Sequence, residues 1–216
     1  MTDIILFDLD GTLTDPQEGI TNCVKYALES VGVSETDYSR LLKFIGPPLV
    51  DSFMDLYGFG REDALVLVEK YRERFSVQGI FENKLYPGVP RMLAELKSAG
   101  KVIALATSKP RVFADRIAEH YNIAKYFDIL SGSELNGTNN YKHEVINSIL
   151  ERLNNPDKSR IVMVGDRRQD VDGAKKCGIA SIGVRFGYAE QGELESAGAD
   201  FIVDDIMSLT ELLLSL

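Results

Sequence analysis

The second half of the chain alternates between two kinds of apolar pattern. Short apolar runs predict buried strands, and the segments between them carry the helical spacing of apolar residues. The expected strands are Val102–Ala106, Phe127–Leu130, Ile161–Val164, Ala180–Val184 and Phe201–Val203. The expected helices are Arg111–Tyr121, His143–Leu153, Val171–Cys177, Glu190–Ala197 and Ile206–Leu214. Such alternation predicts a Rossmann-like α/β fold, with a parallel sheet at the core and helices on both faces.

The N-terminal segment adds one strand, which ends in two carboxylates. The apolar run Ile4–Phe7 is too short for a helix and leads into Asp8, Asp10 and Gly11. Since successive side chains of a strand point to opposite faces, Asp8 and Asp10 share one face. Two like charges so close repel each other unless a cation or a proton compensates them. Mg²⁺ would do so, and the backbone N–H groups from Gly11 onward could hold a phosphate group.

A long helical segment separates this strand from the next one. Helical periodicity covers Gln17–Val31, Ser34–Phe44, Leu49–Tyr57, Glu62–Phe75 and Val89–Ala99. A crossover between parallel strands needs only one helix, so most of this segment must fold as a unit of its own. We therefore predict two domains. Residues 1–15 and 86–216 would form an α/β catalytic core, and residues 16–85 a small all-helical cap inserted after the first strand.

Charge and hydropathy limit the partners that such a chain can have. A formal net charge of −9 over 216 residues argues against a nucleic-acid surface, because basic patches supply most of that affinity. No apolar run approaches the ~18 residues of a membrane span, and the first residues lack the pattern of a secretory signal. Cys23 and Cys177 have no metal-ligand spacing, so we expect reduced thiols. We expect a cytoplasmic protein that is a monomer or a homodimer.

Polar residues also follow the other expected strands. Thr107 and Ser108 come after the second strand, Lys142 starts the helix after the third, and Asp166 and Asp170 follow the fourth. Each alone has a structural reading as a helix cap, a solvated lysine or a turn. In a parallel sheet, however, ligands bind outside the carboxyl ends of the strands. Taken together, these residues favour a site for a phosphate group and Mg²⁺.

In order and placement, these residues resemble the four motifs of the haloacid dehalogenase superfamily of phosphohydrolases. The matching residues are Asp8-Leu9-Asp10-Gly11-Thr12-Leu13, Thr107-Ser108, Lys142, and Gly165-Asp166 with Asp170. The resemblance covers essentially the whole chain, including the helical cap. Within the superfamily the chain is similar to the phosphoglycolate phosphatase-like branch, through the Gly46-Pro47-Pro48-Leu49 loop and the Gly187-Tyr188 pair.

Two positions depart from the pattern of this family. Arg167 and Arg168 follow Asp166, where a small hydroxyl residue is usual, and Tyr141 stands before Lys142, where smaller residues are common. A cation beside the metal carboxylate could tune it or could point to solvent.

The resemblance implies a Mg²⁺-dependent phosphatase that acts on a small phosphate monoester. Asp8 would form an aspartyl-phosphate, and Asp10 would act as general acid and then as general base. The phosphate-binding residues would be Gly11, Thr107, Ser108 and Lys142. The metal-binding residues would be Asp8, Asp10 through its carbonyl oxygen, Asp166, and Asp170 in the outer shell. In the cap, Lys43 and Gly46 are the candidate substrate residues.

Other functions are compatible with the same residues. A phosphomutase would also pass through an aspartyl-phosphate, and a phospho-accepting signalling module would keep the phosphoryl group. A dehalogenase is disfavoured because it needs neither Asp10 nor a divalent metal. The substrate stays open among phosphoglycolate, other small phosphate esters and nucleoside monophosphates.

Overall fold

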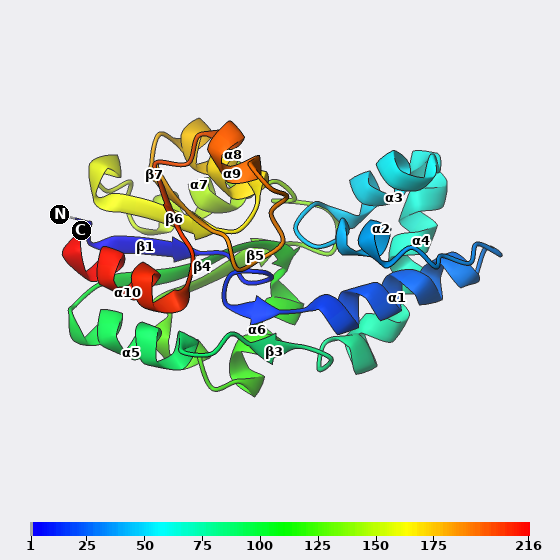
Figure 1. The fold of residues 1–216 in the computed structure, drawn as a ribbon, viewed down its shortest axis with the longest axis horizontal. Helices are drawn as coiled ribbons and strands as arrows, with labels where there is room; N and C mark the ends of the chain where they lie inside the picture. The colour runs from blue at the N-terminus through cyan, green and yellow to red at the C-terminus, as the bar shows by residue number, and fades with distance from the viewer. Residues whose placement is uncertain (1) are drawn as a thin grey trace. The chain divides into compact units, whose positions relative to one another are not determined.

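The computed structural model describes residues 2–216 and confirms the predicted α/β class (Figure 1). Six strands form one parallel sheet in the order β5-β4-β1-β6-β7-β8. They are β1 (Ile4–Phe7), β4 (Val102–Pro110), β5 (Ile129–Ser133), β6 (Ile161–Gly165), β7 (Ala180–Val184) and β8 (Phe201–Val203). The chain winds from β1 to one side of the sheet and then returns to the other side at β6. The reversal of strand order therefore lies beside β1, where ligands of such sheets bind.

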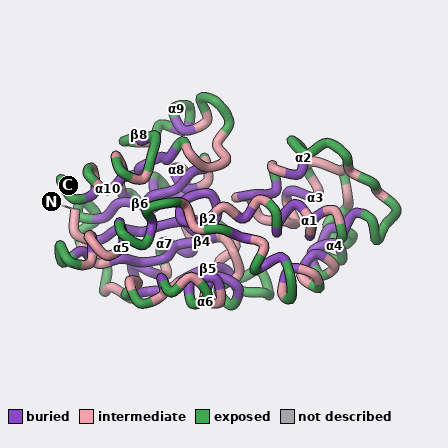
Figure 2. The backbone as a smooth tube through the Cα atoms, turned by 60° about the horizontal axis from the view of Figure 1, so that its bottom comes forward, coloured by how far each residue is buried: buried purple, intermediate pink, exposed green. Residues whose placement is uncertain are grey.

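Helices cover both faces of this sheet, and the strands are therefore buried on both faces. Ile4 and Leu6 of β1 belong to a core cluster with α7 (Lys142–Arg152) and α8 (Arg168–Cys177). Ile5 and Phe7, which are fully buried, point to the opposite face. The remaining helices of this unit are α5 (Val89–Ser98), α6 (Arg111–His120), α9 (Glu193–Ala197) and α10 (Ile206–Ser215). Figure 1 shows α5 and α10 on the side of the sheet opposite α7 and α8, and Figure 2 shows the buried residues along the strands.

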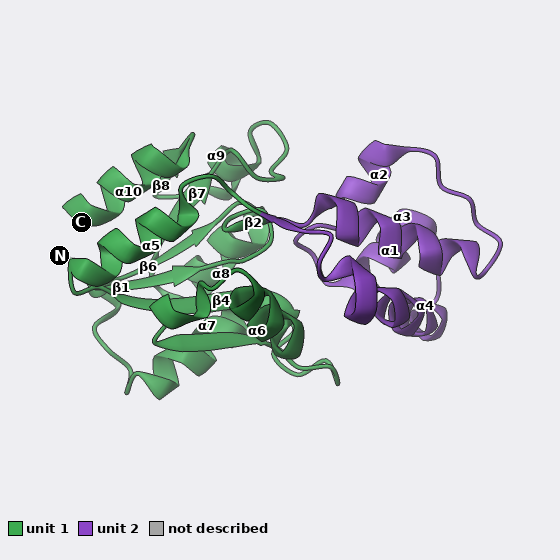
Figure 3. Cartoon of the chain, turned by 90° about the horizontal axis from the view of Figure 1, so that it is seen from below, with its two compact units in different colours: residues 1–14, 85–216 green, residues 15–84 purple. Residues whose placement is uncertain are grey.

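The chain divides into two compact units, residues 1–14 with 85–216 and residues 15–84 (Figure 3). The second unit contains α1 (Gln17–Glu29), α2 (Tyr38–Leu42), α3 (Leu49–Tyr57) and α4 (Arg61–Arg74), followed by a π-helical turn at Phe75–Gly79. The chain passes between the units through β2 (Thr14–Asp15) and β3 (Lys84–Leu85), which pair with each other. The roles of catalytic core and cap that the sequence assigns to the two parts stay predictions.

Several predicted element boundaries are wrong, each for a local reason. The helix expected at 34–44 begins only at Tyr38, because the side chain of Asp37 caps it by accepting from the N–H of Ser39. The helix expected at 190–197 begins at Glu193, after Gly192 with a φ of 78°. The strand expected at 127–130 lies at 129–133, since residues 124–126 form a 3₁₀ turn.

Within residues 2–216, no helix is both long enough and apolar enough to cross a lipid bilayer. Cys23 and Cys177 are free and buried, which agrees with the expectation of reduced thiols.

Helix α1 packs against the π-helical turn so closely that a side chain would not fit between them. A Cβ atom on Gly19 would lie 2.1 Å from the carbonyl oxygen of Gly79. The backbone N–H of Gly19 also donates to the carbonyl oxygen of Glu82 at 2.9 Å. Because both neighbours are backbone groups, neither can move without shifting the chain.

We therefore predict that Gly19→Ala lowers the free energy of unfolding by roughly 1–3 kcal/mol through overpacking. Gly60→Ala is the matched control in the same unit, because the nearest atom to its added Cβ would be 3.7 Å away. Its effect should stay within about 0.5 kcal/mol. Urea unfolding followed by circular dichroism checks both variants, and equal stabilities would contradict the close packing.

Candidate active site

The carboxyl ends of β1, β4 and β6 bring the predicted site residues into one buried region of the unit 1–14 with 85–216. The N–H of Asp8 donates to the carbonyl oxygen of Val164, which ties the end of β1 to β6 at 2.9 Å. The buried side chains of this region are those of Asp8 and Asp10 after β1, Thr107 in β4, Lys142 at the start of α7, Asp166 after β6 and Asp170 in α8. The parallel pairing of the strands therefore brings residues that are spread over more than 160 positions of the sequence into one cluster.

Lys142 is the cation at the centre of this cluster. Its ammonium nitrogen lies 2.8 Å from Oδ1 of Asp8 and 2.9 Å from Oδ1 of Asp170, and it donates to the carbonyl oxygen of Ala106 at 2.8 Å. Burial by itself would lower the pKa of Lys142, but the carboxylates of Asp170 and Asp8 raise it above its usual value. Lys142 is therefore charged at neutral pH and offsets the negative charge of both acids.

Three carboxylates of the cluster could hold one metal ion. Asp8, Asp166 and Asp170 each place one carboxylate oxygen within 4.8 Å of the others. Oδ1 of Asp8 and Oδ1 of Asp170 are buried, and the ammonium group of Lys142 lies beside both of them. Oxygen ligands of this kind suit a hard divalent cation. The cluster therefore fits a divalent metal.

The crowding of these acids shifts their protonation. Burial raises the pKa of Asp166 well above its usual range, and the nearby carboxylates of Asp170 and Asp8 add to the shift. Burial also raises the pKa of Asp170 to about 6, although Lys142 opposes this shift. A divalent cation would favour the ionised form of both groups.

Backbone and hydroxyl donors fix the orientation of two of these acids. Asp166 accepts from the N–H of Tyr188 at 2.7 Å and from the hydroxyl of Thr12 at 3.3 Å. Asp170 accepts from the N–H of Arg167 at 3.1 Å. The sequence pattern predicts no role for the donors Thr12 and Tyr188, although both lie in the family motifs.

Two motif glycines leave room for the carboxylates. Gly11 has a φ of 87°, and a Cβ atom there would lie 2.2 Å from Oδ2 of Asp166. A Cβ atom on Gly165 would lie 2.1 Å from the carboxyl carbon of Asp170. Glycine is required at both positions because the acids pack directly against the backbone.

Asp10 stands apart from the three-carboxylate group. Its Oδ2 forms an ion pair with Lys109, which is not among the site residues predicted from the sequence. Burial raises the pKa of Asp10, and Lys109 limits the shift. The available signal was the position of Lys109, directly after Thr107 and Ser108 at a strand end. The predicted contact of the Asp10 carbonyl with the metal stays a prediction.

Arg167 does not point to solvent, and its charge acts on the neighbouring acid, because it opposes the rise in the pKa of Asp166 that burial causes. Its Nε lies 3.0 Å from Oε1 of Glu193, and the same oxygen accepts from the N–H of Arg168 at 2.8 Å. Both side chains of the pair are mostly buried. Glu193 therefore fixes the start of α8, a contact that no local pattern indicates.

The two predicted substrate residues of the cap belong to the unit 15–84. Lys43 is exposed at the end of α2, and Gly46 has a φ of 110°. Their role in substrate binding stays a prediction.

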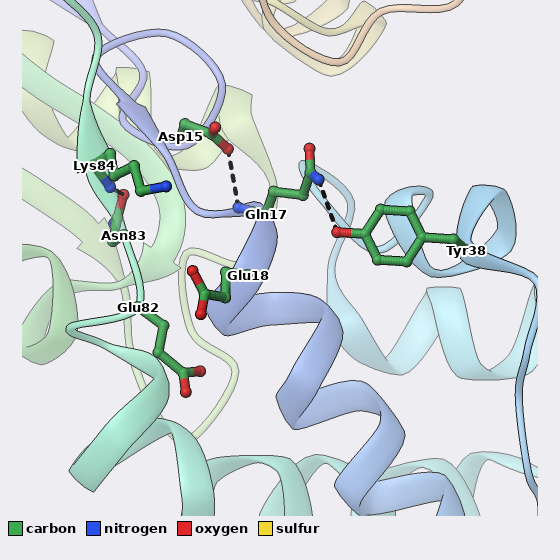
Figure 4. A pocket seen from close by; sticks show the side chains of 7 residues that line it. All are labelled: Asp15, Gln17, Glu18, Tyr38, Glu82, Asn83 and Lys84. Carbon is green, nitrogen blue, oxygen red and sulfur yellow. Dashed lines mark hydrogen bonds between the residues drawn. The ribbon is translucent and has the colours of Figure 1, made fainter.

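The same unit contains a cavity of about 300 Å³ (Figure 4). Its lining residues are Asp15, Gln17, Glu18, Tyr38, Glu82, Asn83 and Lys84. Asp15 accepts from the N–H of Gln17 at 3.1 Å, and the Gln17 amide donates to the hydroxyl of Tyr38 at 2.7 Å. Glu82 pairs with Arg74 at 2.7 Å. These hydrogen bonds and this ion pair account for much of the polar lining of the cavity. None of the site residues predicted from the sequence lies here.

Comparison with known proteins connects this geometry to a family. A family model described as haloacid dehalogenase-like hydrolase matches residues 5–184. The chain is 44% identical to a Pseudomonas aeruginosa protein named 5'-nucleotidase, over 97% of this chain and 94% of that protein. It is 36% identical to tyrosine-protein kinase PtkA of Mycobacterium tuberculosis, over 92% of this chain and 65% of that protein. A crystal structure of a predicted phosphatase from Clostridium acetobutylicum matches with a TM-score of 0.97 and 45% identity, over 100% of both chains.

The raised pKa of Asp170 predicts a pH dependence of the stability of the metal-free protein. Between about pH 4 and 6 the folded protein keeps a proton that the unfolded chain releases, since the pKa rises from 3.8 to about 6 on folding. This contribution is complete below the unfolded pKa and is lost as the pH rises through about 6. With chelator present, the free energy of unfolding of the wild type relative to Asp170→Asn should fall by about 2 kcal/mol between pH 4 and 8. A constant difference between the two proteins in urea unfolding would contradict this assignment.

Proposed function

The chain belongs to the haloacid dehalogenase-like hydrolase family, and from this premise we propose that it is a Mg²⁺-dependent phosphatase for small phosphate monoesters. The reaction passes through an aspartyl-phosphate on Asp8. The observation that carries this proposal is the buried ion pair of Lys142 with Asp8 and Asp170, beside the carboxylate of Asp166. Such a group holds a nucleophile, a cation and a metal site within a few ångströms.

Asp8 acts as the nucleophile in this proposal. One of its oxygens forms a bond to phosphorus as the bond from phosphorus to the ester oxygen breaks, which divides hydrolysis into two easier steps. Lys142 offsets the negative charge that Asp8 and the phosphoryl group bring together. Asp8, Asp166 and the carbonyl oxygen of Asp10 would hold Mg²⁺, and Asp170 would lie in the outer shell. When bound, Mg²⁺ supplies positive charge against the phosphoryl oxygens.

Asp10 moves the protons of both steps. It gives its proton to the leaving alkoxide and then takes a proton from the water that attacks the aspartyl-phosphate, so that Asp8 is released unchanged. The raised pKa of Asp10 supports the first role, because a buried carboxyl group keeps its proton more readily. The hydroxyl of Thr107 and the backbone N–H of Ser108 bind the phosphoryl oxygens. The N–H of Gly11, which the sequence also assigned to phosphate binding, donates instead to the carbonyl oxygen of Thr14 at 2.7 Å.

The relative named 5'-nucleotidase supports a nucleoside 5'-monophosphate as the substrate class. Phosphoglycolate, which the resemblance of the sequence implies, is the alternative within the same chemistry. Both substrates are phosphate monoesters of an alkyl alcohol, and the catalytic residues would treat them alike.

A second candidate function is phosphoryl transfer to a tyrosine, because one relative is named a tyrosine-protein kinase. The chain spans about two thirds of that protein, 65% of its length. The two functions differ in the fate of the phosphoryl group. Hydrolysis gives inorganic phosphate at every turnover, whereas a kinase gives phosphotyrosine in an acceptor.

We predict that the wild-type protein releases inorganic phosphate from adenosine 5'-monophosphate or phosphoglycolate only when Mg²⁺ is present. Asp8→Asn should abolish turnover, because an amide is a poor nucleophile for phosphorus. Asp204→Asn is the matched control, since Asp204 is an exposed acid of the same unit that pairs with Arg185. A phosphate assay over a panel that includes p-nitrophenyl phosphate measures all three proteins. Turnover in Asp8→Asn near the wild-type rate would rule out this nucleophile.

We also predict that Mg²⁺ stabilises the folded protein. A ligand that binds only the folded state raises the free energy of unfolding, by about 2.7 kcal/mol at a concentration of 100 Kd. The melting temperature should therefore be higher with millimolar Mg²⁺ than with chelator, both in the wild type and in the control variant Asp204→Asn. Asp166→Asn should lose most of this difference. An unchanged response in Asp166→Asn would remove Asp166 from the metal site.

A further inference from the structure

The two oxygens of the Asp10 carboxylate lie in different environments. Oδ2 pairs with the ammonium group of Lys109, and both side chains are nearly buried, at 11% and 7% exposure. Oδ1 is buried and accepts no hydrogen bond from the residues that the structure describes. One oxygen is therefore held, and the other is left for a further partner.

The backbone that carries Lys109 is fixed by its neighbours. The N–H of Lys109 donates to the hydroxyl of Thr107 at 3.2 Å. A Cβ atom on Gly132 would lie 2.5 Å from the carbonyl oxygen of Lys109, so β5 packs directly against this backbone. The hydroxyl of Ser133 in β5 also donates to the carbonyl oxygen of Ser108 at 2.8 Å. Lys109 thus extends from a rigid part of the sheet rather than from a free loop.

A carboxyl group that rotates freely presents either oxygen to a reacting atom. Small losses of orientation are expensive in catalysis, and a displacement of about 1 Å can reduce a rate by about 10²-fold. A charged hydrogen-bond partner on one oxygen restricts this rotation. We propose that Lys109 is a positioning residue, which holds Oδ2 of Asp10 so that Oδ1 delivers the proton to the leaving group. This inference rests on the proposed function, in which Asp10 is the general acid.

The proton balance of this step determines how the inference can be tested. The proton passes from Oδ1 of Asp10 to the ester oxygen as the bond from that oxygen to phosphorus breaks, and Lys109 keeps all of its protons. An alkoxide is a strong base and needs this proton to leave. The p-nitrophenolate ion is a weak base and leaves without it. Loss of the orientation of Asp10 should therefore slow the cleavage of alkyl phosphates but hardly change the cleavage of p-nitrophenyl phosphate.

The experiment compares kcat/KM for adenosine 5'-monophosphate and p-nitrophenyl phosphate with Mg²⁺ in the wild type, Lys109→Met, Asp10→Asn and the double variant. This constant reports the steps up to departure of the leaving group. Asp10→Asn should lower it by about 10² for the nucleotide. Lys109→Met should lower it by about 10-fold or more for the nucleotide and by less than about 3-fold for p-nitrophenyl phosphate. The double variant should match Asp10→Asn within about 2-fold, because both changes remove one function.

Two further variants separate positioning from a general loss of structure. Lys97→Met removes a lysine that pairs with Asp128 at 2.7 Å on the surface of the same unit, and it should leave both constants unchanged. Lys109→Arg keeps a cation and should recover part of the lost nucleotide activity. If Lys109→Met unfolds because Asp10 loses its partner, the double variant removes both charges, and its comparison with Asp10→Asn decides the question.

The inference would be overturned if Lys109→Met lowered kcat/KM equally for both substrates. It would also be overturned if Lys109→Met lowered kcat/KM further in the Asp10→Asn background. Either result would mean that Lys109 binds the phosphoryl group or only maintains the fold. If Asp10→Asn lowered kcat/KM equally for both substrates, the acid role of Asp10 in the proposed function would be wrong, and the inference would fail with it. The behaviour of Asp10→Asn therefore distinguishes the two failures.

Discussion

The structure depends on the compensation of the negative charges of four carboxylates that are buried close together. Asp8, Asp10, Asp166 and Asp170 are all nearly inaccessible to water, and a buried carboxylate without a partner is strongly destabilising. Lys142 compensates Asp8 and Asp170, and Lys109 compensates Asp10. The N–H of Tyr188 and the hydroxyl of Thr12 serve Asp166. The compensation is incomplete, as the raised pKa of Asp166 indicates, and a divalent cation would complete it.

The parallel sheet makes this concentration of charge possible. The pairing of β1 with β4 and β6 brings three strand ends together. Asp8 and Asp10 follow β1, Asp166 follows β6, and Thr107 lies in the last part of β4. Gly11 and Gly165 allow the carboxylates to lie against the backbone. Helix α7 starts at Lys142, so the first turn of a well-packed helix supplies the central cation. The rigidity of the site thus follows from the same hydrophobic core that stabilises the sheet.

Two acids separated by one residue have different partners, and this difference agrees with different tasks. Asp8 lies with Lys142 and near Asp166 and Asp170, where Lys142 stabilises its negative charge, as the proposed role of nucleophile requires. Asp10 lies outside that group with Lys109, where one of its oxygens is held and the other is not. Separate ion pairs therefore allow the proposed nucleophile and the proposed proton donor to lie side by side, each beside its own lysine.

The sequence by itself determined the fold class, the presence of every strand of the large sheet and which polar residues follow or end those strands. These features depend on local patterns, namely the period of apolar residues and polar residues directly after buried runs. Only the tertiary structure decided which groups meet. The pairing of Lys109 with Asp10 joins residues 99 positions apart, and the hydrogen bond of Thr12 to Asp166 joins residues 154 positions apart. The contact of Arg167 with Glu193 also joins residues that no local pattern connects. Periodicity fixes which face of an element is buried, whereas ion pairs depend on which strand ends the sheet places next to each other.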